Sequence, residues 1–272
     1  LYCASVLQWP WYLCLLAAML FGAIWGALPG IFKAYLNINE VITAIMFNWI
    51  GLYMVNDIMY GKGKSPMYDL ASTKTYSLRK AAPQAMIPSL GMSELFGKLQ
   101  SVTIAIFIAI FFAIVVYIIL NKTAFGYELR ACGFNKNAAR YAGINEKRNI
   151  ILAMMISGAL AGVGAGLYYL STVAEWNPQV STALPAMGFN GISTALLACS
   201  NPIGTIFSSL FISYITVGGT KLSTQYYTKE IADVITALII YLCAFSLLFK
   251  NKIRALLVGK AKRVSVGKGG DD

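Results

Sequence analysis

Side chains that could do chemistry are few and widely spaced in this sequence. Histidine, the commonest general base and metal ligand in proteins, is absent from the 272 residues. Four carboxylates, Glu40, Asp57, Glu175 and Asp233, lie in loops or at the ends of apolar runs, and none lies in the middle of such a run. The sequence shows no Gly-rich phosphate loop and no nucleophile–base pattern. These features favour a non-catalytic chain.

The cysteines give no sign of a metal centre or of a disulfide framework. Most of the five, Cys3, Cys14, Cys132, Cys199 and Cys243, fall inside apolar runs. No two of them have the spacing of a metal-ligand pair. We therefore expect neither a zinc site nor a set of stabilising disulfides.

A few uncharged polar residues inside apolar segments could instead contact a passing solute. An asparagine amide offers both donors and acceptors to a polar molecule. Serine and threonine hydroxyls in helices more often bond back to their own backbone, so both roles stay open for them. The candidates for a translocation path are Asn48, Asn190, Ser193 and Thr194.

The elements that carry these residues are long apolar runs. Hydrophobic residues make up 58% of the chain and charged residues 12%. Several runs reach the roughly 18 residues that a bilayer span requires, and they show no alternation typical of barrel strands. The sequence predicts an all-α integral membrane protein. The predicted spans are 9–32, 40–60, 102–120, 150–170, 203–219 and 231–249.

Glycines recur at helical spacing in two of these spans. Gly22, Gly26 and Gly30 follow one another every four residues, and the stretch GALAGVGAG covers residues 158–166. Small residues on one face allow two helix backbones to approach closely inside a membrane. We interpret both stretches as helix-packing surfaces rather than as a substrate path or a phosphate loop.

A polar stretch, TAFGYELRACGFNKNAARYAGIN (123–145), separates two uncharged spans. Within it, Asn135 can cap the start of a short helix, and Gly143 stands where a left-handed residue would end it. The spacing predicts this helix within residues 135–143.

On that helix the apolar face would consist of methyl groups. At about 100° per residue, Ala138, Ala139 and Ala142 share one side, and Lys136 and Arg140 lie opposite. A helix that lies on lipid usually carries larger apolar residues. We therefore expect this helix to dock into a groove of another protein.

Charge and parity give a topology. Thirteen of the 22 Lys and Arg residues fall in 121–150 or 250–272, which predicts that the segment 121–149 and the tail 250–272 are cytoplasmic. An even number of crossings must then separate them, so 187–200 should cross as well. The loop 61–101 is consequently predicted to be external, although it carries six basic residues. We attribute the net charge of +11 to these basic cytoplasmic segments and not to a surface that binds nucleic acid.

The segment 123–145 resembles the cytoplasmic coupling segment of bacterial ABC-importer permeases of the ribose/branched-chain-amino-acid type. The stretches GALPGIFKAYLNINEVITAIMFNWI (26–50) and GFNGISTALLACSNPIG (188–204) resemble the nucleoside and simple-sugar branch of that family. The coupling residues that the resemblance implies are Phe125, Gly126, Arg130, Gly133, Asn135, Ala138, Ala139, Arg140 and Gly143.

The resemblance implies one polytopic permease domain over 1–272, in the bacterial plasma membrane and without the N-terminal spans of other members. It also implies a separate ABC ATPase that binds the ATP, a second permease subunit, identical or different, and an extracytoplasmic substrate-binding protein. The chain itself would need no cofactor, and its other contacts would be with lipid. The implied solute is a nucleoside, or else a simple sugar.

An ion-coupled secondary transporter or channel is the alternative. Such proteins often carry carboxylates within their spans. Glu40 and Asp233 lie at span ends, yet they could still face a cavity.

Overall fold

The computed structural model describes residues 1–60, 68–69, 74–75, 78, 82–89, 103–171 and 184–222, with a few positions between 231 and 242. It divides into two units, Leu1–Leu184 and Pro185–Asp272. Most of the predicted loop 61–101, most of the last span 231–249 and all of the tail 250–272 lie outside the described residues.

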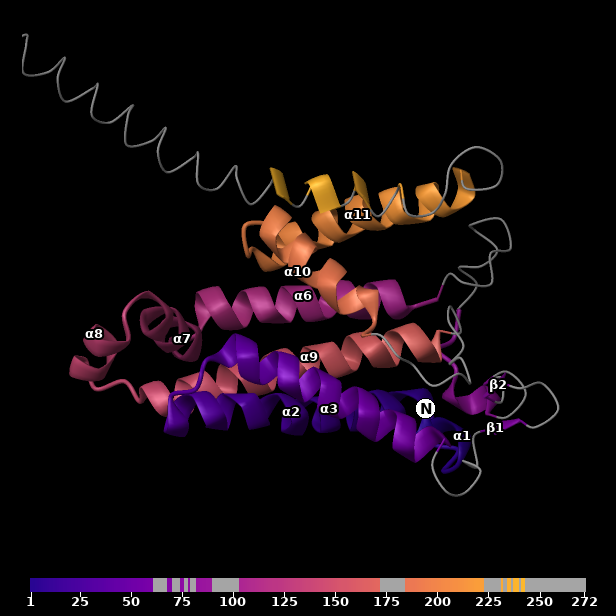
Figure 1. The fold of residues 1–272 in the computed structure, drawn as a ribbon, viewed down its shortest axis with the longest axis horizontal. Helices are drawn as coiled ribbons and strands as arrows, with labels where there is room; N and C mark the ends of the chain where they lie inside the picture. The colour runs from indigo at the N-terminus through magenta and orange to yellow at the C-terminus, as the bar shows by residue number, and fades with distance from the viewer. Residues whose placement is uncertain are drawn as a thin grey trace, which may run out of the picture. The chain divides into compact units, whose positions relative to one another are not determined.

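The first unit is mainly helical (Figure 1). A two-residue antiparallel pair, in which Tyr68 faces Thr75, and one 3₁₀ turn accompany the helices. The elements are α1 (Tyr2–Ser5), α2 (Trp11–Leu36), α3 (Glu40–Tyr60), β1 (Tyr68–Asp69), β2 (Lys74–Thr75), η1 (Pro83–Ala85), α6 (Ala105–Lys122), α7 (Ala124–Phe134), α8 (Lys136–Tyr141) and α9 (Glu146–Leu170). The second unit contributes α10 (Ala186–Leu197) and α11 (Pro202–Leu222).

Five helices of the described chain, α2, α3, α6, α9 and α11, are long and apolar enough to cross a membrane. They correspond to five of the predicted spans, so the predicted all-α membrane architecture is confirmed. The first span ends later than the predicted residue 32, because α2 continues to Leu36 and ends only where Asn37 adopts the left-handed conformation (φ 52°). The fourth span starts earlier than predicted, because the Asn145 side chain accepts a hydrogen bond from the Arg148 N–H (3.1 Å) and caps α9 there.

Helices α2 and α9 pack with their backbones in direct contact. A Cβ atom added at Gly26 would lie 2.9 Å from the Gly158 Cα and 2.6 Å from the Met154 carbonyl oxygen. A Cβ added at Gly158 would lie 2.8 Å from the Gly26 Cα, and one at Gly22 would lie 3.1 Å from the Gly162 Cα. Distances this short leave no room for any side chain, so the predicted role of both glycine stretches in helix packing is confirmed.

Helix α3 packs on α2 through aromatic rings instead. The rings of Trp25 and Phe47 meet edge to face with centroids 5.8 Å apart. An ion pair between the Lys33 Nζ and the Glu40 Oε2 (2.6 Å) joins the facing ends of the two helices. Glu40 is therefore held by a neighbouring cation at the end of its span.

In the second unit, α10 and α11 form a helical hairpin. The Asn201 side chain accepts hydrogen bonds from the N–H groups of Ile203 (3.0 Å) and Gly204 (3.3 Å), which caps α11 at its proline start. The Ser208 hydroxyl donates to the Thr194 carbonyl (2.8 Å) and links the two helices. With 12 residues, α10 is about 18 Å long, well short of a bilayer core. The crossing by 187–200 therefore stays a prediction.

Candidate functional site

The segment 121–149 forms a polar projection at one end of the first unit, beyond the ends of α6 and α9 (Figure 1). The Thr123 hydroxyl donates to the Ile119 carbonyl (2.6 Å) and accepts from the Gly126 N–H (3.1 Å), so it ends α6 and starts α7. A Cβ on Gly126 would overlap the Ile119 carbonyl and lie 2.6 Å from the Leu120 Cα. Only glycine therefore allows α7 to fold back this closely on α6.

Polar side chains join α7 to the two long helices beside it. The Asn149 side-chain nitrogen donates to the Glu128 carboxylate (3.2 Å) and approaches the Cys132 Sγ (3.7 Å). On the outer side, the Arg130 guanidinium donates to the Asn121 side-chain oxygen (3.3 Å), with both residues exposed. Helix α7 is thus fixed to α6 and to α9.

Helix α8 begins and ends as the sequence predicts. The Asn135 side chain accepts hydrogen bonds from the N–H groups of Asn137 (3.0 Å) and Ala138 (3.2 Å). At the other end Gly143 is left-handed (φ 80°), and the Ile144 N–H bonds to the Ala139 carbonyl (3.0 Å), which is the pattern of a Schellman motif. The predicted cap residues are confirmed.

The predicted alanine face is divided. Ala138 and Ala142 are exposed, as are Lys136 and Arg140, but Ala139 is only 3% exposed. On a helix Ala139 lies about 100° from Ala138, so one alanine can face the protein interior while its neighbour stays exposed. The part of the stripe that is open to a partner is therefore Ala138 and Ala142.

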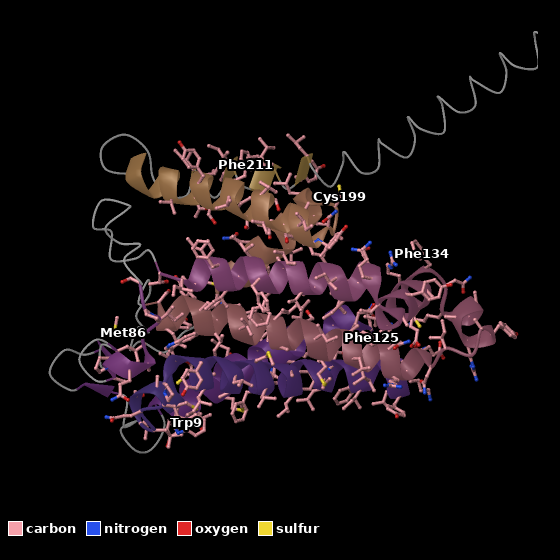
Figure 2. The ribbon with its side chains drawn as sticks, turned by 180° about the vertical axis from the view of Figure 1, so that it is seen from behind. Trp9, Met86, Phe125, Phe134, Cys199 and Phe211 are labelled. Carbon is pink, nitrogen blue, oxygen red and sulfur yellow. The ribbon has the colours of Figure 1, made fainter. Side chains whose placement is uncertain are left out.

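Two aromatic residues on the projection were not among the predicted site residues. Phe134 at the end of α7 is 91% exposed, and Tyr141 at the end of α8 is 94% exposed (Phe134 is labelled in Figure 2). By contrast Phe125 is half-buried, and open space surrounds the position of a Cβ on Gly133. Large apolar residues in so polar a stretch were the signal that could have identified them.

The candidate path residues fall into the two units. Asn48 lies exposed on α3, and the other three lie on α10. The hydroxyls of Ser193 and Thr194 donate to the carbonyls of Phe189 (3.0 Å) and Gly191 (2.8 Å), so both bond back to their own helix. Asn190 is half-buried, and within the described part of the chain its side-chain amide has no hydrogen-bond partner.

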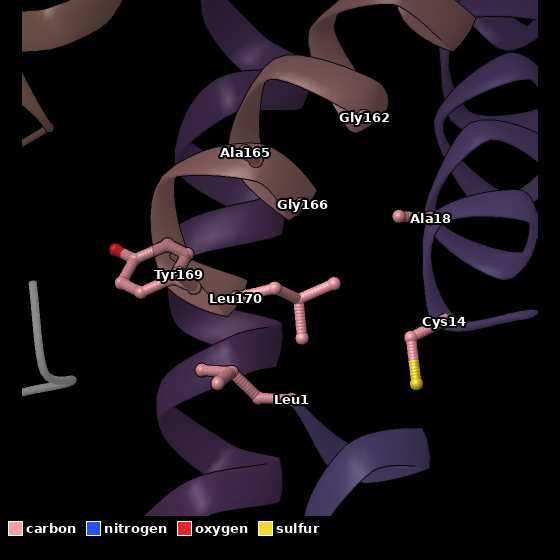
Figure 3. A pocket seen from close by; sticks show the side chains of 8 residues that line it. All are labelled: Leu1, Cys14, Ala18, Gly162, Ala165, Gly166, Tyr169 and Leu170. Carbon is pink, nitrogen blue, oxygen red and sulfur yellow. The ribbon is translucent and has the colours of Figure 1, made fainter. Parts of the chain in front are cut away.

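A cavity of about 300 Å³ lies between α2 and α9 (Figure 3). The Tyr169 hydroxyl points away from the other side chains that line it, and no charged residue contributes to its wall. It is an apolar hollow beside the glycine contact, and it contains none of the predicted path residues. Its lining consists of Leu1, Cys14, Ala18, Gly162, Ala165, Gly166, Tyr169 and Leu170.

Within the described ranges, no three His, Cys, Asp or Glu side chains come close enough together to hold a metal ion. In the described structure the predicted coupling residues cap helix ends, pack between helices or lie exposed. Nothing in their arrangement activates a nucleophile or moves a proton.

Comparisons with known proteins identify the family of the chain. Residues 1–244 match the family described as the branched-chain amino acid transport system / permease component. The chain is 32% identical over 257 residues to the nucleoside ABC transporter permease protein NupB of Lactococcus lactis, a match that covers 94% of this chain and 69% of that protein. It is 31% identical to the guanosine ABC transporter permease protein NupP of Bacillus subtilis, over 92% of this chain and 68% of the relative.

More distant similarity extends to the glucose ABC transporter permease protein TsgB13 of Haloferax volcanii, at 25% identity over 87% of this chain and 61% of that protein. No solved structure matches the chain. The family match favours an ABC permease over the ion-coupled alternative. The chain therefore belongs to the branched-chain amino acid transport system / permease component family, as a non-catalytic, multi-pass permease subunit of an ABC importer in the bacterial plasma membrane, where a partner ATPase hydrolyses the ATP.

Proposed function

We propose that this permease imports nucleosides and that the segment 121–149 docks on its ATPase. In this proposal 1–272 acts as one permease domain, together with a second permease subunit and an extracytoplasmic binding protein. ATP-driven closure of the ATPases displaces the docked segment and switches the side on which the permease is open.

The observation that carries the docking proposal is the exposed surface of α8 and its neighbours. The small side chains of Ala138 and Ala142 permit close approach, and Phe134 and Tyr141 present large apolar surfaces beside them. Buried aromatic anchors surrounded by polar residues are typical of the energetic centres of protein interfaces. The exposed cations of α8 favour a partner groove with an acidic rim.

A charge placed on the open alanine stripe tests the docking. Ala138 is the third residue of α8, where glutamate favours the helix itself, so Ala138→Glu should leave α8 folded. We expect the variant to lose ATPase co-purification and substrate-stimulated ATP hydrolysis by more than about tenfold. Ala139→Glu is a poorer test, because Ala139 is buried within the chain.

Asn137→Glu is the matched control for this experiment, because it adds the same charge at the neighbouring exposed position of α8. It should retain the ATPase. Normal coupled transport by Ala138→Glu would exclude docking through this stripe.

The nucleoside proposal rests on the relatives and on α10. Two relatives above 30% identity are named as nucleoside and guanosine permeases. Asn190 supplies a half-buried amide whose donors and acceptor suit a base or sugar edge. Because the binding protein would provide most of the selectivity, weak contacts along the path are sufficient.

Uptake by cells that carry the complete operon tests the solute. We expect uptake of labelled guanosine or adenosine in preference to ribose, and a reduced rate in Asn190→Leu with the ATPase still bound. Ser193→Ala is the control, because that hydroxyl already bonds to its own helix. Uptake of ribose without nucleosides would assign the permease to sugars, and an unchanged rate in Asn190→Leu would remove Asn190 from the path.

The proposed topology places 61–101 outside the cell and 250–272 in the cytoplasm. Single cysteines at Ser72 and Ser265, in a background without the native cysteines, can be probed in intact cells with an impermeant thiol reagent. We expect labelling at position 72 and not at 265. The opposite pattern would invert the topology.

A further inference from the structure

The projection contains two parts that are attached to the rest of the first unit in different ways. Helix α8 is joined through Asn135, whose backbone is extended (φ −155°), and through the left-handed Gly143. Helix α7 is held instead by side-chain contacts to α9 and by the tight backbone contact of Gly126 with α6. A force applied to α8 can therefore reach α9 by two routes, directly along the chain through Gly143 and indirectly through α7.

The contact between α7 and α9 centres on Asn149. This side chain is 2% exposed, the largest fully buried side chain in the described part of the molecule. Its nitrogen donates to the Glu128 carboxylate (3.2 Å) and faces the buried Cys132 Sγ (3.7 Å). A hydrogen bond that is partly shielded from water is stronger than a fully exposed one. The bond thus fixes α7 on the first turn of α9.

From Asn149 the connection continues into the membrane. Helix α9 runs on to the glycines that touch α2 backbone to backbone, with a virtual Cβ at Gly158 only 2.8 Å from the Gly26 Cα. Close-packed contacts of this kind transmit displacement rather than absorb it. A movement of α7 is therefore passed to α9, and α9 carries α2 with it.

We infer that the partly buried Glu128–Asn149 hydrogen bond transmits the movement of the docked segment to the α9–α2 helix pair, which makes Glu128 and Asn149 positioning residues for coupling. The inference rests on the proposed docking of the ATPase on α7 and α8. Without this bond the ATPase still docks and still hydrolyses ATP, but α7 moves without α9 and less solute is transported for each ATP.

An exchange of the two polar groups tests this role. In Asn149→Asp two carboxylates face each other, which should lower guanosine uptake per ATP hydrolysed by about threefold to tenfold in proteoliposomes that contain the complete transporter. In the double variant Glu128→Gln, Asn149→Asp the amide and the carboxylate change places, and the coupling ratio should return to near the wild-type value. If the uptake assay in cells shows that the solute is ribose, labelled ribose is used in the proteoliposomes instead of guanosine.

The control is Ser171→Ala, which removes a hydroxyl that donates to the Tyr168 carbonyl at the other end of α9 and should leave the ratio unchanged. If Asn149→Asp fails to assemble, Glu128→Ala removes the same bond from the other side and should also lower the ratio. A wild-type ratio in Asn149→Asp or in Glu128→Ala, or an assembled double variant that stays uncoupled, would overturn the inference.

Cys132 gives a second readout. In a protein whose only cysteine is Cys132, a small maleimide should label the wild type slowly throughout ATP turnover, and Asn149→Ala quickly. Equal rates would show that α7 and α9 do not depend on this bond. Failure of the docking proposal has a different signature, because the ATPase would then be retained by Ala138→Glu.

Discussion

The α2–α9 contact and the α7–α8 projection obtain a defined geometry by opposite means. In the membrane pair the defining residues are glycines, and the two backbones touch because side chains are missing. In the projection the defining residues are Thr123, Asn135 and Asn149, whose side chains bond to particular backbone or polar groups. The comparison shows that missing side chains are enough to define the α2–α9 contact, whereas the polar projection adds directed hydrogen bonds to its one tight glycine contact at Gly126.

The largest expected effect is the loss of the glycine contact. A Cβ at Gly158 would also meet the Gly22 carbonyl, so Gly158→Val should force α2 and α9 apart and destabilise the protein by more than about 3 kcal/mol. The thermal unfolding midpoint in detergent measures this. Gly164→Val is the control on the same helix, since a Cβ there meets nothing within 4 Å. Equal midpoints for the two variants would mean that the contact does not position the helices.

An intermediate effect is expected where the projection itself uses a glycine. In Gly126→Ala the new methyl group meets the last turn of α6, so α7 must tilt away, at a cost of about 1–3 kcal/mol. Binding of the purified ATPase should weaken accordingly, as a titration would show. Gly133→Ala, where the added Cβ has open space, should bind as the wild type does. The reverse order of affinities would contradict the tight α6–α7 turn.

The smallest effect concerns a cap. Asn135→Ala leaves two N–H groups of α8 without their acceptor and should destabilise that helix by about 1 kcal/mol. We expect a several-fold weaker ATPase affinity and an unchanged unfolding midpoint for the membrane helices. Asn137→Ala is matched to it, because the Asn137 side chain has no capping role. A lowered midpoint in Asn135→Ala would show that the two regions are not energetically separate.

Local signals predicted most of the elements. Apolar runs located the five long helices, and Asn135 and Gly143 located the ends of α8, because capping depends only on residues a few positions apart. Gly22, Gly26 and Gly158 indicated close packing, yet the sequence does not say which stripe faces which. That pairing depends on the whole arrangement of the helices.

Contacts between distant positions could not be predicted. Glu128 and Asn149 are 21 residues apart, and no residue next to either of them in the sequence predicts their hydrogen bond. The burial of Ala139 has the same origin, because a helical wheel gives the relation between Ala138 and Ala139 but not the direction of the protein interior. Phe134 and Tyr141 are single large residues at helix ends, and their exposure depends on the tertiary arrangement, which no local pattern specifies.

The glycine contact also has an evolutionary consequence. Every amino-acid replacement of Gly26 or Gly158 adds atoms where a neighbouring backbone already lies. Any single replacement at these two positions therefore pushes the helices apart. A second mutation in the partner helix cannot restore the contact, because the atoms that clash there belong to the backbone and not to a side chain that could be made smaller. Among natural variants and in a saturation library, we expect glycine to be retained at these two positions. The exposed apolar positions around them should instead accept replacement by other apolar residues.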